Sequence, residues 1–465
     1  MLHSRYNPVA EAERYINSLT LKPDTQFFIL IEPGLGYIIP ILREKRPDAK
    51  IIALHVTEPT GAAPTATPSW SPAHKETLQN FLESEIPDAG ATVIQVIEWR
   101  PAMAMYGERY LRLLAETVDF IRRIDANRRT NREFGRRWFS NFFKNLRLVN
   151  RCCHPPTLPF NTPVIVTGAG PSLENAIPLI REQRSEVFLL AASSSVLALE
   201  TRGVIPDMII STDGGGWALM HLYECLRDSP VAAAPPFVLA ASMNAALPSQ
   251  CASLPLLLLS DGSLWQGFVL HKLGIPFVRL LQRGTVTASA LDLAFILTKG
   301  SVVISGTDLA INDIRIHAHP YSFERQLELR ANRLLPLYNQ YFTRARAIAD
   351  GKSHDIYAAW FKSHIAEWPK RFYSLGSNSA AFNEIPQWDG AAYRHTSQKL
   401  KTTRIAHPAP VKAAVALLSR ALSNTAIKQE LASLLLPDES APDTVSIADL
   451  KYIIGDLTKA QLFYE

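Results

Sequence analysis

The sequence predicts an α/β protein with a Rossmann-like N-terminal domain, a central parallel-sheet domain and a helical C-terminal region. Three observations predict this class. A chain of 465 residues is too long for one ordinary domain. A strand–glycine turn–helix–strand unit occurs near its start. From residue 164 onward, short apolar runs alternate with helical patterns, and most runs end in glycine or a polar residue.

The first predicted domain spans residues 1–105. A strand at Gln26–Ile31 leads through Gly34 and Gly36 into a helix, and Ile51–Val56 supplies the next strand. This turn superficially matches the first motif of S-adenosylmethionine-dependent methyltransferases, with Glu58 where a ribose-binding acid could lie. Because Glu58 falls beyond the strand end, we favour a structural Rossmann-like domain. The remaining predicted elements are a loop at Pro59–Pro72, a helix at Ala73–Glu85 and a strand at Thr92–Ile97.

Residues 106–160 are predicted to be a bridging helix followed by a linker. Apolar residues recur at helical spacing over 107–150, and basic residues alternate with aromatic ones between Asn127 and Leu146. Such interleaving can indicate nucleic-acid binding. The basic excess is confined to this helix, so we expect a bridge whose aromatic residues pack inward and no nucleic-acid partner. The linker begins at His154-Pro155-Pro156.

The composition describes a cytoplasmic globular protein. The formal net charge is +5, which is mild for this length. Residues 1–19 lack the apolar core of a signal peptide, and no apolar run approaches a membrane span. The four cysteines fit neither a disulfide framework nor a metal site, although Cys152-Cys153-His154 suggests zinc at first sight. We therefore expect reduced cysteines and no structural metal.

The central domain, residues 161–320, opens with the most informative stretch of the chain. Val164–Thr167 is a predicted buried strand, and a turn from Gly168 to Ser172 leads into a helix from Leu173 to about Gln183. Ser172 is a suitable N-cap. A glycine turn before a helix N-terminus can hold a phosphate or carboxylate, and it can also be an ordinary βα turn.

Similar polar turns follow the later predicted strands. Because parallel strands end on one edge of their sheet, these turns should lie together, where open α/β sheets bind ligands. A further predicted helix begins at Gly284-Thr285-Val-Thr287 and ends at Thr298. The turn residues are Ser193, Ser194 and Ser195; Asp213; Asn244; Asp261; and Gly306 and Asp308.

The C-terminal region, residues 321–370 and 391–465, has a helical pattern. The predicted helices cover Glu324–Ala349, His354–Glu367, Val411–Leu422, Ala426–Leu435 and Ile447–Tyr464. Between them, the segment Phe372–Pro386 resembles a strand with irregular flanks. We expect residues 371–390 to return to the central sheet.

Taken in order, these motifs resemble the motility-associated-factor family of flagellin glycosyltransferases, which shares a domain with 6-hydroxymethylpterin pyrophosphokinase MptE-like proteins. The glycine turn is also similar to that of bacterial CMP-sialyltransferases, with Ala169 replacing an asparagine. The matching motifs are Gly34-Leu-Gly36-Tyr37, Asn127…Arg137-Trp138…Asn141…Asn145-Leu146, Gly168-Ala-Gly170-Pro171-Ser172-Leu173-Glu174, Gly203-Val-Ile-Pro206-Asp207, Thr212-Asp213, Gly284-Thr-Val-Thr-Ala-Ser289, Asp292-Leu-Ala, Gly306-Thr-Asp308-Leu-Ala310 and His317-Ala318.

The resemblance implies a sialyltransferase-like central domain of GT-A or Rossmann type. It also implies transfer of a pseudaminic or legionaminic type of nonulosonic acid from its CMP-activated donor to Ser or Thr of flagellin. CMP is a good leaving group, so no cofactor or metal is obligatory. The glycine turn and Thr285–Thr287 could meet the phosphate charge. His317, or else His319, could act as the general base; an ordinary surface or hydrogen-bonding role is the alternative.

The other donor-binding candidates each have a structural alternative. Asp213 could orient the sugar or ribose, or cap the turn that follows it. Asp308 could bind cytosine or ribose, or cap a short helix. Ser193 and Ser194 could contact the sugar, or only provide small side chains beneath it.

Three other functions compete with the glycosyltransferase. A pterin-type diphosphokinase would use ATP and Mg²⁺, with Asp213 and Asp308 as the converging carboxylates. A flagellar accessory protein would keep the fold without turnover. A methyltransferase depends on Gly34–Gly36 alone. No stretch of the sequence indicates an oligomeric state.

Overall fold

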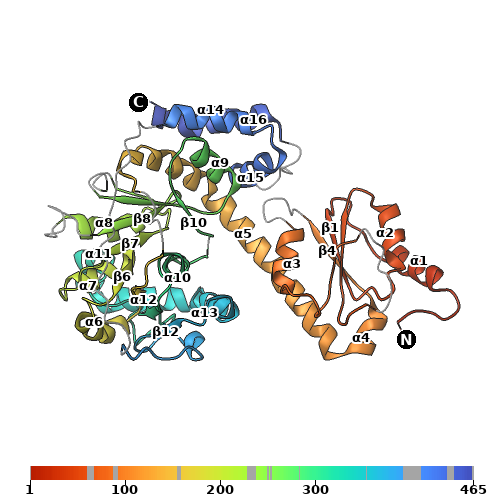
Figure 1. Cartoon of the computed structure of the whole chain (residues 1–465), viewed down its shortest axis with the longest axis horizontal. Coiled ribbons are helices and arrows are strands. Elements are labelled where there is room, and N and C mark those ends of the chain that lie inside the picture. Colours follow the sequence, from red (N-terminus) through yellow and green to blue (C-terminus); the bar gives the residue numbers. More distant parts are fainter. Residues whose placement is uncertain are drawn as a thin grey trace. The chain divides into compact units, whose positions relative to one another are not determined.

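The computed structural model describes residues 2–59, 67–86, 93–153, 159–227, 237–248, 251, 254–281, 283–351, 353–390, 410–436 and 445–462. Its contacts divide the chain into two units (Figure 1). The N-terminal unit contains Met1–Arg136 and Leu422–Lys451, and the central unit contains Arg137–Ala421 and Tyr452–Glu465. No helix among the described residues is both long enough and apolar enough to cross a bilayer.

The N-terminal unit is built on a four-stranded parallel sheet in the order β3-β2-β1-β4. The strands are β1 (Phe27–Ile31), β2 (Lys50–Leu54), β3 (Ser69–Trp70) and β4 (Ile94–Glu98), and the helices are α1 (Pro8–Ser18), α2 (Ile38–Lys45), α3 (Leu78–Glu85) and α4 (Arg100–Tyr106). The predicted Rossmann-like unit is therefore present. Residues 60–66 of the predicted loop and Thr92 lie outside the described residues.

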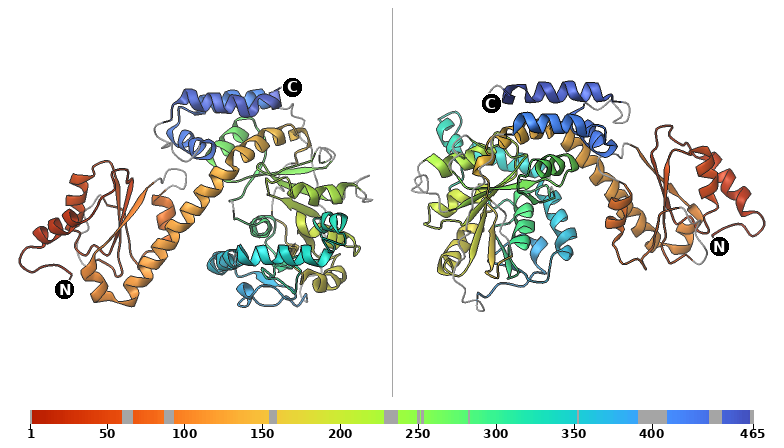
Figure 2. Two further views of the ribbon diagram at one scale, coloured as in Figure 1. Left: turned by 180° about the vertical axis from the view of Figure 1, so that it is seen from behind. Right: turned by 45° about the horizontal axis from the view of Figure 1, so that its top comes forward.

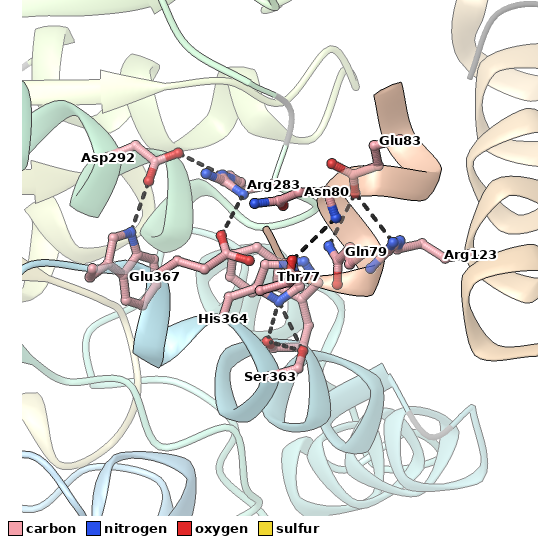
Figure 3. Close-up of polar contacts among 12 residues, drawn as sticks. Thr77, Gln79, Asn80, Glu83, Arg123, Arg283, Asp292, Ser363, His364 and Glu367 are labelled. Atoms are coloured by element: carbon pink, nitrogen blue, oxygen red, sulfur yellow. Dashed lines mark hydrogen bonds and ion pairs between the residues drawn. The ribbon is translucent and has the colours of Figure 1, made fainter. Parts of the chain in front are cut away.

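Helix α5 (Glu108–Leu146) is a single helix of 39 residues. In the N-terminal unit, Tyr110, Phe120 and Ile124 join the hydrophobic core, and Arg123 pairs with Glu83 of α3 at 3.2 Å (Figure 3). Its close contact with α15 (Thr425–Leu435) includes the Arg136 guanidinium, which donates to the Leu435 carbonyl at 2.8 Å. Both residues belong to the N-terminal unit, which includes residues 422–451.

In the central unit, the last turns of α5 are anchored by aromatic and amide side chains. Phe139, Phe142 and Phe143 are fully buried, and Phe142 lies 4.7 Å from Trp265 between ring centroids. The Asn145 amide donates to the carbonyls of Met243 (3.0 Å) and Ala245 (2.9 Å). The aromatic residues therefore pack inward, as the bridging-helix interpretation requires. The helix predicted over 107–150 ends slightly early, at Leu146, and the short 3₁₀ turn η1 (Val149–Arg151) follows it.

The central unit has an eight-stranded parallel sheet in the order β10-β9-β8-β7-β6-β5-β11-β12, with helices on both faces (Figure 2). Its residues alternate between two hydrophobic cores, one on each face, and nearly all are buried. This confirms the predicted doubly covered sheet. The strands are β5 (Val164–Thr167), β6 (Phe188–Ala192), β7 (Met208–Ser211), β8 (Val238–Ser242), β9 (Leu256–Ser260), β10 (Val278–Arg279), β11 (Val302–Ser305) and β12 (Phe372–Ser374).

The strand order places a topological switch point beside β5. From β5 the chain adds β6 to β10 on one side, and β11 then crosses to the other side of β5. Ligands of open α/β sheets bind at the carboxyl ends of strands at such a point. The helices of this unit are α6 (Leu173–Glu182), α7 (Val196–Glu200), α8 (Ala218–Arg227), α9 (Leu264–Lys272), α10 (Val286–Leu297), α11 (Glu324–Arg330), α12 (Leu337–Asp350), α13 (Ser353–His364) and α14 (Val411–Ala421).

The region after β11 departs from the predicted single helix over Glu324–Ala349, which was wrong. The structure has α11 and α12 with a turn between them. The Asn332 side-chain oxygen accepts from the backbone N–H groups of Leu334 and Leu335, and Pro336 directly precedes α12 without an N–H to continue a helix. β12 pairs with β11, so residues 372–374 do return to the sheet. The last helix, α16, covers Ile447–Leu462.

Candidate functional site

The candidate site is formed by the turns that follow β5 and β11, the two strands at the switch point. The backbones of these two turns are in direct contact. Gly170 N–H donates to the Gly306 carbonyl at 2.7 Å, and a Cβ on Gly168 would lie 2.6 Å from the same oxygen. Gly306 itself has φ +67°. Glycine is needed at 168 for space, and at 306 because side chains rarely adopt that backbone conformation.

The glycine turn is filled by a carboxylate of the protein itself. Asp308 Oδ2 accepts from the backbone N–H of Ser172 at 3.1 Å and from its hydroxyl at 2.8 Å. A Cβ on Gly170 would lie only 1.9 Å from that oxygen. Burial raises the pKa of Asp308, and the two bonds from Ser172 oppose the rise. The acceptor position before helix α6 is thus filled by Asp308 of the protein itself.

Ser172 is the N-cap residue of α6, as predicted, but its side chain has a different role. Its side chain makes no capping bond to α6, because its hydroxyl donates to Asp308. The predicted cap position is therefore confirmed, and only the capping bond expected from the side chain is not made. A cap requires the side-chain oxygen as an acceptor for a helix N–H, whereas here the nearby carboxylate draws the hydroxyl away as a donor.

The β12 segment closes the same site from the other side. Thr307 N–H donates to the Asn378 side chain at 2.9 Å, and Ser379 N–H donates to the Thr307 carbonyl at 2.8 Å. Within the described part of the chain, the buried hydroxyls of Ser305 and Thr307 have no hydrogen-bond partner. Unpaired buried hydroxyls are uncommon, so these two are candidate contacts for a ligand.

Both predicted histidines belong to a segment that packs on the glycine turn, since Ala318 N–H donates to the Ala169 carbonyl at 2.8 Å. His319 Nδ1 lies 2.8 Å from the carboxylate of Glu324, which is only 3% exposed. The His319 side chain is 54% exposed. An acceptor on Nδ1 places the proton there and leaves Nε2 as the basic nitrogen of a half-exposed ring. This arrangement is that of a general base oriented by a carboxylate.

The position of His319 is fixed by Glu174 in the first turn of α6. Glu174 accepts from the backbone N–H of His319 at 2.9 Å and pairs with Arg315 at 2.9 Å and Arg202 at 3.6 Å. The Arg202 guanidinium also donates to the His319 carbonyl. These contacts hold the loop against the glycine turn, which accounts for Glu174 within the motif.

His317 has different surroundings. Its ring stacks on Tyr321 with centroids 3.9 Å apart, and its Nδ1 lies 3.5 Å from the Arg344 guanidinium. Burial, with Arg344 second, holds the pKa of His317 well below its usual value, so the ring is neutral. Arginine can only donate, so Nδ1 accepts and the proton lies on Nε2. In this geometry His317 offers a hydrogen-bond donor, and His319 is the better-placed base.

Three further residues of the site were missed by sequence reasoning: His221, Tyr321 and Arg344. Burial lowers the pKa of His221 to about 4 and raises the pKa of Tyr321 to about 12. His221 Nδ1 lies 3.2 Å from the Ser322 hydroxyl, and Arg344 lies over the Tyr321 ring at 5.2 Å. No motif marks them, because they come from α8, a loop and α12 and meet only in the fold.

The remaining predicted residues lie after their own strands or at a helix start. Ser193 and Ser194 belong to the turn η2 (Ser193–Ser195) after β6. Asp213 follows β7 and accepts from Gly215 N–H at 2.7 Å, as its structural alternative expects. Thr285 caps α10 by accepting from Ala288 N–H at 3.1 Å, as predicted, and Thr287 lies in the first turn.

The start of α10 is further stabilised by a part-buried ion pair (Figure 3). Arg283 donates to Asp292 at 2.6 Å and lies 3.9 Å from Glu367. Trp368 donates to the other Asp292 oxygen at 3.0 Å. Asp292 of the sequence motif therefore positions the helix that carries Thr285 and Thr287.

The comparisons with known proteins cover much of this unit. The model of the family "6-hydroxymethylpterin diphosphokinase MptE-like" matches residues 136–313. The match begins at the inward-packing end of α5 and includes the glycine turn and Asp308. The predicted resemblance to MptE-like proteins is confirmed for this segment.

Two relatives are proteins of Treponema pallidum (strain Nichols) that are named only as uncharacterized. One is 28% identical over 309 residues, which cover 65% of this chain and 64% of the relative. The other is 30% identical over 118 residues, covering 25% and 54%. The chain thus spans less than two thirds of these relatives. Among solved structures, the MAf glycosyltransferase from Magnetospirillum magneticum AMB-1 aligns over 98% of this chain and 78% of its own, with TM-score 0.47 and 14% identity.

Proposed function

We propose that the protein is a glycosyltransferase that moves a nonulosonic acid of the pseudaminic or legionaminic type from its CMP-activated donor to Ser or Thr of flagellin. The observation that supports this best is the His319–Glu324 pair beside the glycine turn, because group transfer to a hydroxyl needs a base at that edge of the sheet. The choice of donor and acceptor depends on the resemblance of the ordered motifs to the motility-associated-factor family.

In the proposed reaction, the acceptor hydroxyl oxygen bonds to the anomeric carbon of the sugar as the bond from that carbon to the CMP phosphate oxygen breaks. The hydroxyl proton passes to His319 Nε2, and the Glu324 carboxylate stabilises the imidazolium that forms. CMP leaves with the bonding electron pair. The Arg344 guanidinium and His317 Nε2–H could offset its charge, as their contact orients both groups.

Asp308 is proposed to hold the nucleoside of the donor. Its Oδ2 already accepts two bonds from Ser172, so Oδ1 would accept from a ribose hydroxyl or the cytosine amino group. The buried hydroxyls of Ser305 and Thr307 flank the same turn. The phosphate would then lie nearer to the basic residues than to the glycine turn, whose anion position Asp308 fills.

The second candidate is an ATP-dependent pterin diphosphokinase, which the description of the matching family favours. Its two Mg²⁺-holding carboxylates would be Asp308 and Asp213. Asp308 is bonded to Ser172 and Asp213 to Gly215 N–H. Holding one metal with both would require each to exchange those bonds for the ion.

A transfer assay tests the proposal. The protein, CMP-nonulosonic acid and purified flagellin are incubated, and the sugar on Ser or Thr is measured by mass spectrometry. We expect transfer that falls at least about 100-fold in His319→Gln and persists in His271→Gln, a change at an exposed histidine of α9. Transfer without loss in His319→Gln would refute the assigned base.

Calorimetry separates the alternatives. CMP binding without ATP binding supports the glycosyltransferase. Binding of ATP with Mg²⁺, followed by pyrophosphate transfer to 6-hydroxymethyl-dihydropterin, would establish the diphosphokinase. Binding of flagellin with no nucleotide would indicate an accessory protein.

A further inference from the structure

The N-terminal unit contains a cavity that the proposed reaction does not use. Its volume is about 450 Å³, within the range of small-molecule sites. It lies at the carboxyl ends of β1 and β2, the edge where Rossmann-like sheets bind ligands. The residues that carry the argument are Glu32, Gly34, Tyr37, Glu58, Met105 and Tyr106.

The glycine turn of this cavity is already occupied. His3 Nε2 accepts from Leu35 N–H at 2.9 Å, and a Cβ on Gly34 would lie 2.3 Å from the same nitrogen. Burial lowers the pKa of His3, so the ring is a neutral acceptor. The Leu35 N–H group, which would bind a phosphate in a dinucleotide site, therefore already has His3 as its acceptor.

The strand ends add negative charge to the cavity. Glu32 is 3% exposed; its Oε2 accepts from Val56 N–H at 2.7 Å, and Oε1 lies 3.4 Å from His55 Nδ1. Its backbone has φ +48°, a left-handed conformation that is costly for a glutamate and recurs at ligand sites. Glu58 adds a second, exposed carboxylate. The lining also includes Arg5, so with neutral histidines the two carboxylates leave one formal negative charge, which disfavours an anionic ligand.

The other wall is apolar and partly exposed. Met105 from the end of α4 is 54% exposed and Leu35 is 56% exposed, and both line the cavity with the rings of Tyr37 and Tyr106. A flat ring can pack against such side chains. Carboxylates next to an apolar wall match a molecule with hydroxyl donors at one end and a flat ring at the other.

We propose that this cavity binds a nucleoside without phosphate groups. The ribose hydroxyls donate to Glu58 and Glu32, and the base packs on the tyrosine and methionine side chains. Adenosine and the cationic S-adenosylmethionine share this chemistry. A nucleotide such as AMP is disfavoured because the carboxylates repel its phosphate. The Leu35 N–H group, which could bind that phosphate, already donates to His3.

Isothermal titration calorimetry on the full chain tests this, with adenosine, S-adenosylmethionine and AMP as probes. We expect adenosine or S-adenosylmethionine to bind at least about 10-fold more tightly than AMP. Tighter binding of S-adenosylmethionine than of adenosine would show that the site selects the cationic ligand. Equal affinity would show that the site recognises the nucleoside part alone.

Variants distinguish this cavity from the central site. Glu58→Gln should weaken adenosine or S-adenosylmethionine at least about 10-fold, because a charge-assisted bond to the ribose is lost. Glu44→Gln, a change at an exposed glutamate on α2 outside the cavity lining, should leave binding unchanged. Tighter binding of AMP, no binding of either nucleoside, or equal effects of Glu58→Gln and Glu44→Gln would overturn the proposal.

Discussion

Replacing Gly170 by alanine tests whether Asp308 controls the glycine turn. Gly170 is not in the left-handed region, so its requirement is one of space alone. The new Cβ would lie 1.9 Å from Asp308 Oδ2, 2.8 Å from its Cγ and 2.9 Å from its backbone nitrogen. The carboxylate must move, and the backbone nitrogen is also too close.

The expected cost follows from the bonds that Asp308 loses. Two hydrogen bonds from Ser172 end on Oδ2, and bonds to a charged group contribute about 1.5–3 kcal/mol each. Since the displaced carboxylate regains water, we expect Gly170→Ala to lower the free energy of unfolding of the central unit by about 2–4 kcal/mol. Gly216→Ala is the matched control, because nothing lies within 4 Å of its Cβ position. It should change stability by less than about 0.5 kcal/mol.

The assay is urea unfolding followed by hydrogen exchange at amides of β5 and β11, which reports the central unit separately. Asp308→Ala should largely remove the added cost of Gly170→Ala, since the overlapping carboxylate is gone and neighbouring changes are not additive. The reasoning fails if Gly170→Ala costs no more than Gly216→Ala, or if its cost is unchanged in the Asp308→Ala background.

Three further predictions use the same unfolding measurement. Burial raises the pKa of Glu200 from 4.5 to about 7, so the folded state keeps a proton that the unfolded chain loses and stability falls as pH rises between these values. Glu200→Gln should therefore stabilise by about 1 kcal/mol more at pH 8 than at pH 4, allowing for solvent screening of a partly exposed group; an equal effect at both pH values would contradict this. Thr285→Ala should cost about 1 kcal/mol through the lost cap of α10, and Thr285→Ser should restore most of it. Asn145→Ala should cost about 2–3 kcal/mol because two buried carbonyls lose their donor, and a cost below 0.5 kcal/mol would show that α5 is held by its aromatic residues alone.

The sheet of the central unit was predictable because its signals are local. Apolar runs such as Val164–Thr167 are buried on both faces, and that burial selects continuous hydrophobic sequence. Thr285 could be recognised as a cap because the bond that it makes spans only three residues. The break between α11 and α12 was not predicted because the helical periodicity continues on both sides of it. Pro336 and the turn at Asn332 interrupt the helix between them.

The site was only partly predictable because its decisive contacts are long-range. Ser172 and Asp308 are 136 positions apart in the chain, and no spacing rule links them. His317 and His319 have the same residue type two positions apart, yet Arg344 from α12 and Glu324 give their rings opposite tautomers. Sequence could nominate both histidines, and only their surroundings separate a hydrogen-bond donor from a base.

The same distinction applies to the glycine turns. A glycine turn between a strand and a helix N-terminus favours a negative charge or a hydrogen-bond acceptor beside its backbone N–H groups, and the sequence pattern predicts such a position. In the central unit Asp308 fills this position, and in the N-terminal unit His3 accepts from the turn at Leu35. We therefore propose that a ligand at either site is recognised by groups around the turn: the His319–Glu324 pair in one unit and the Glu32 and Glu58 carboxylates in the other. The chemistry of those neighbours, rather than the glycine motif, decides which molecule each site selects.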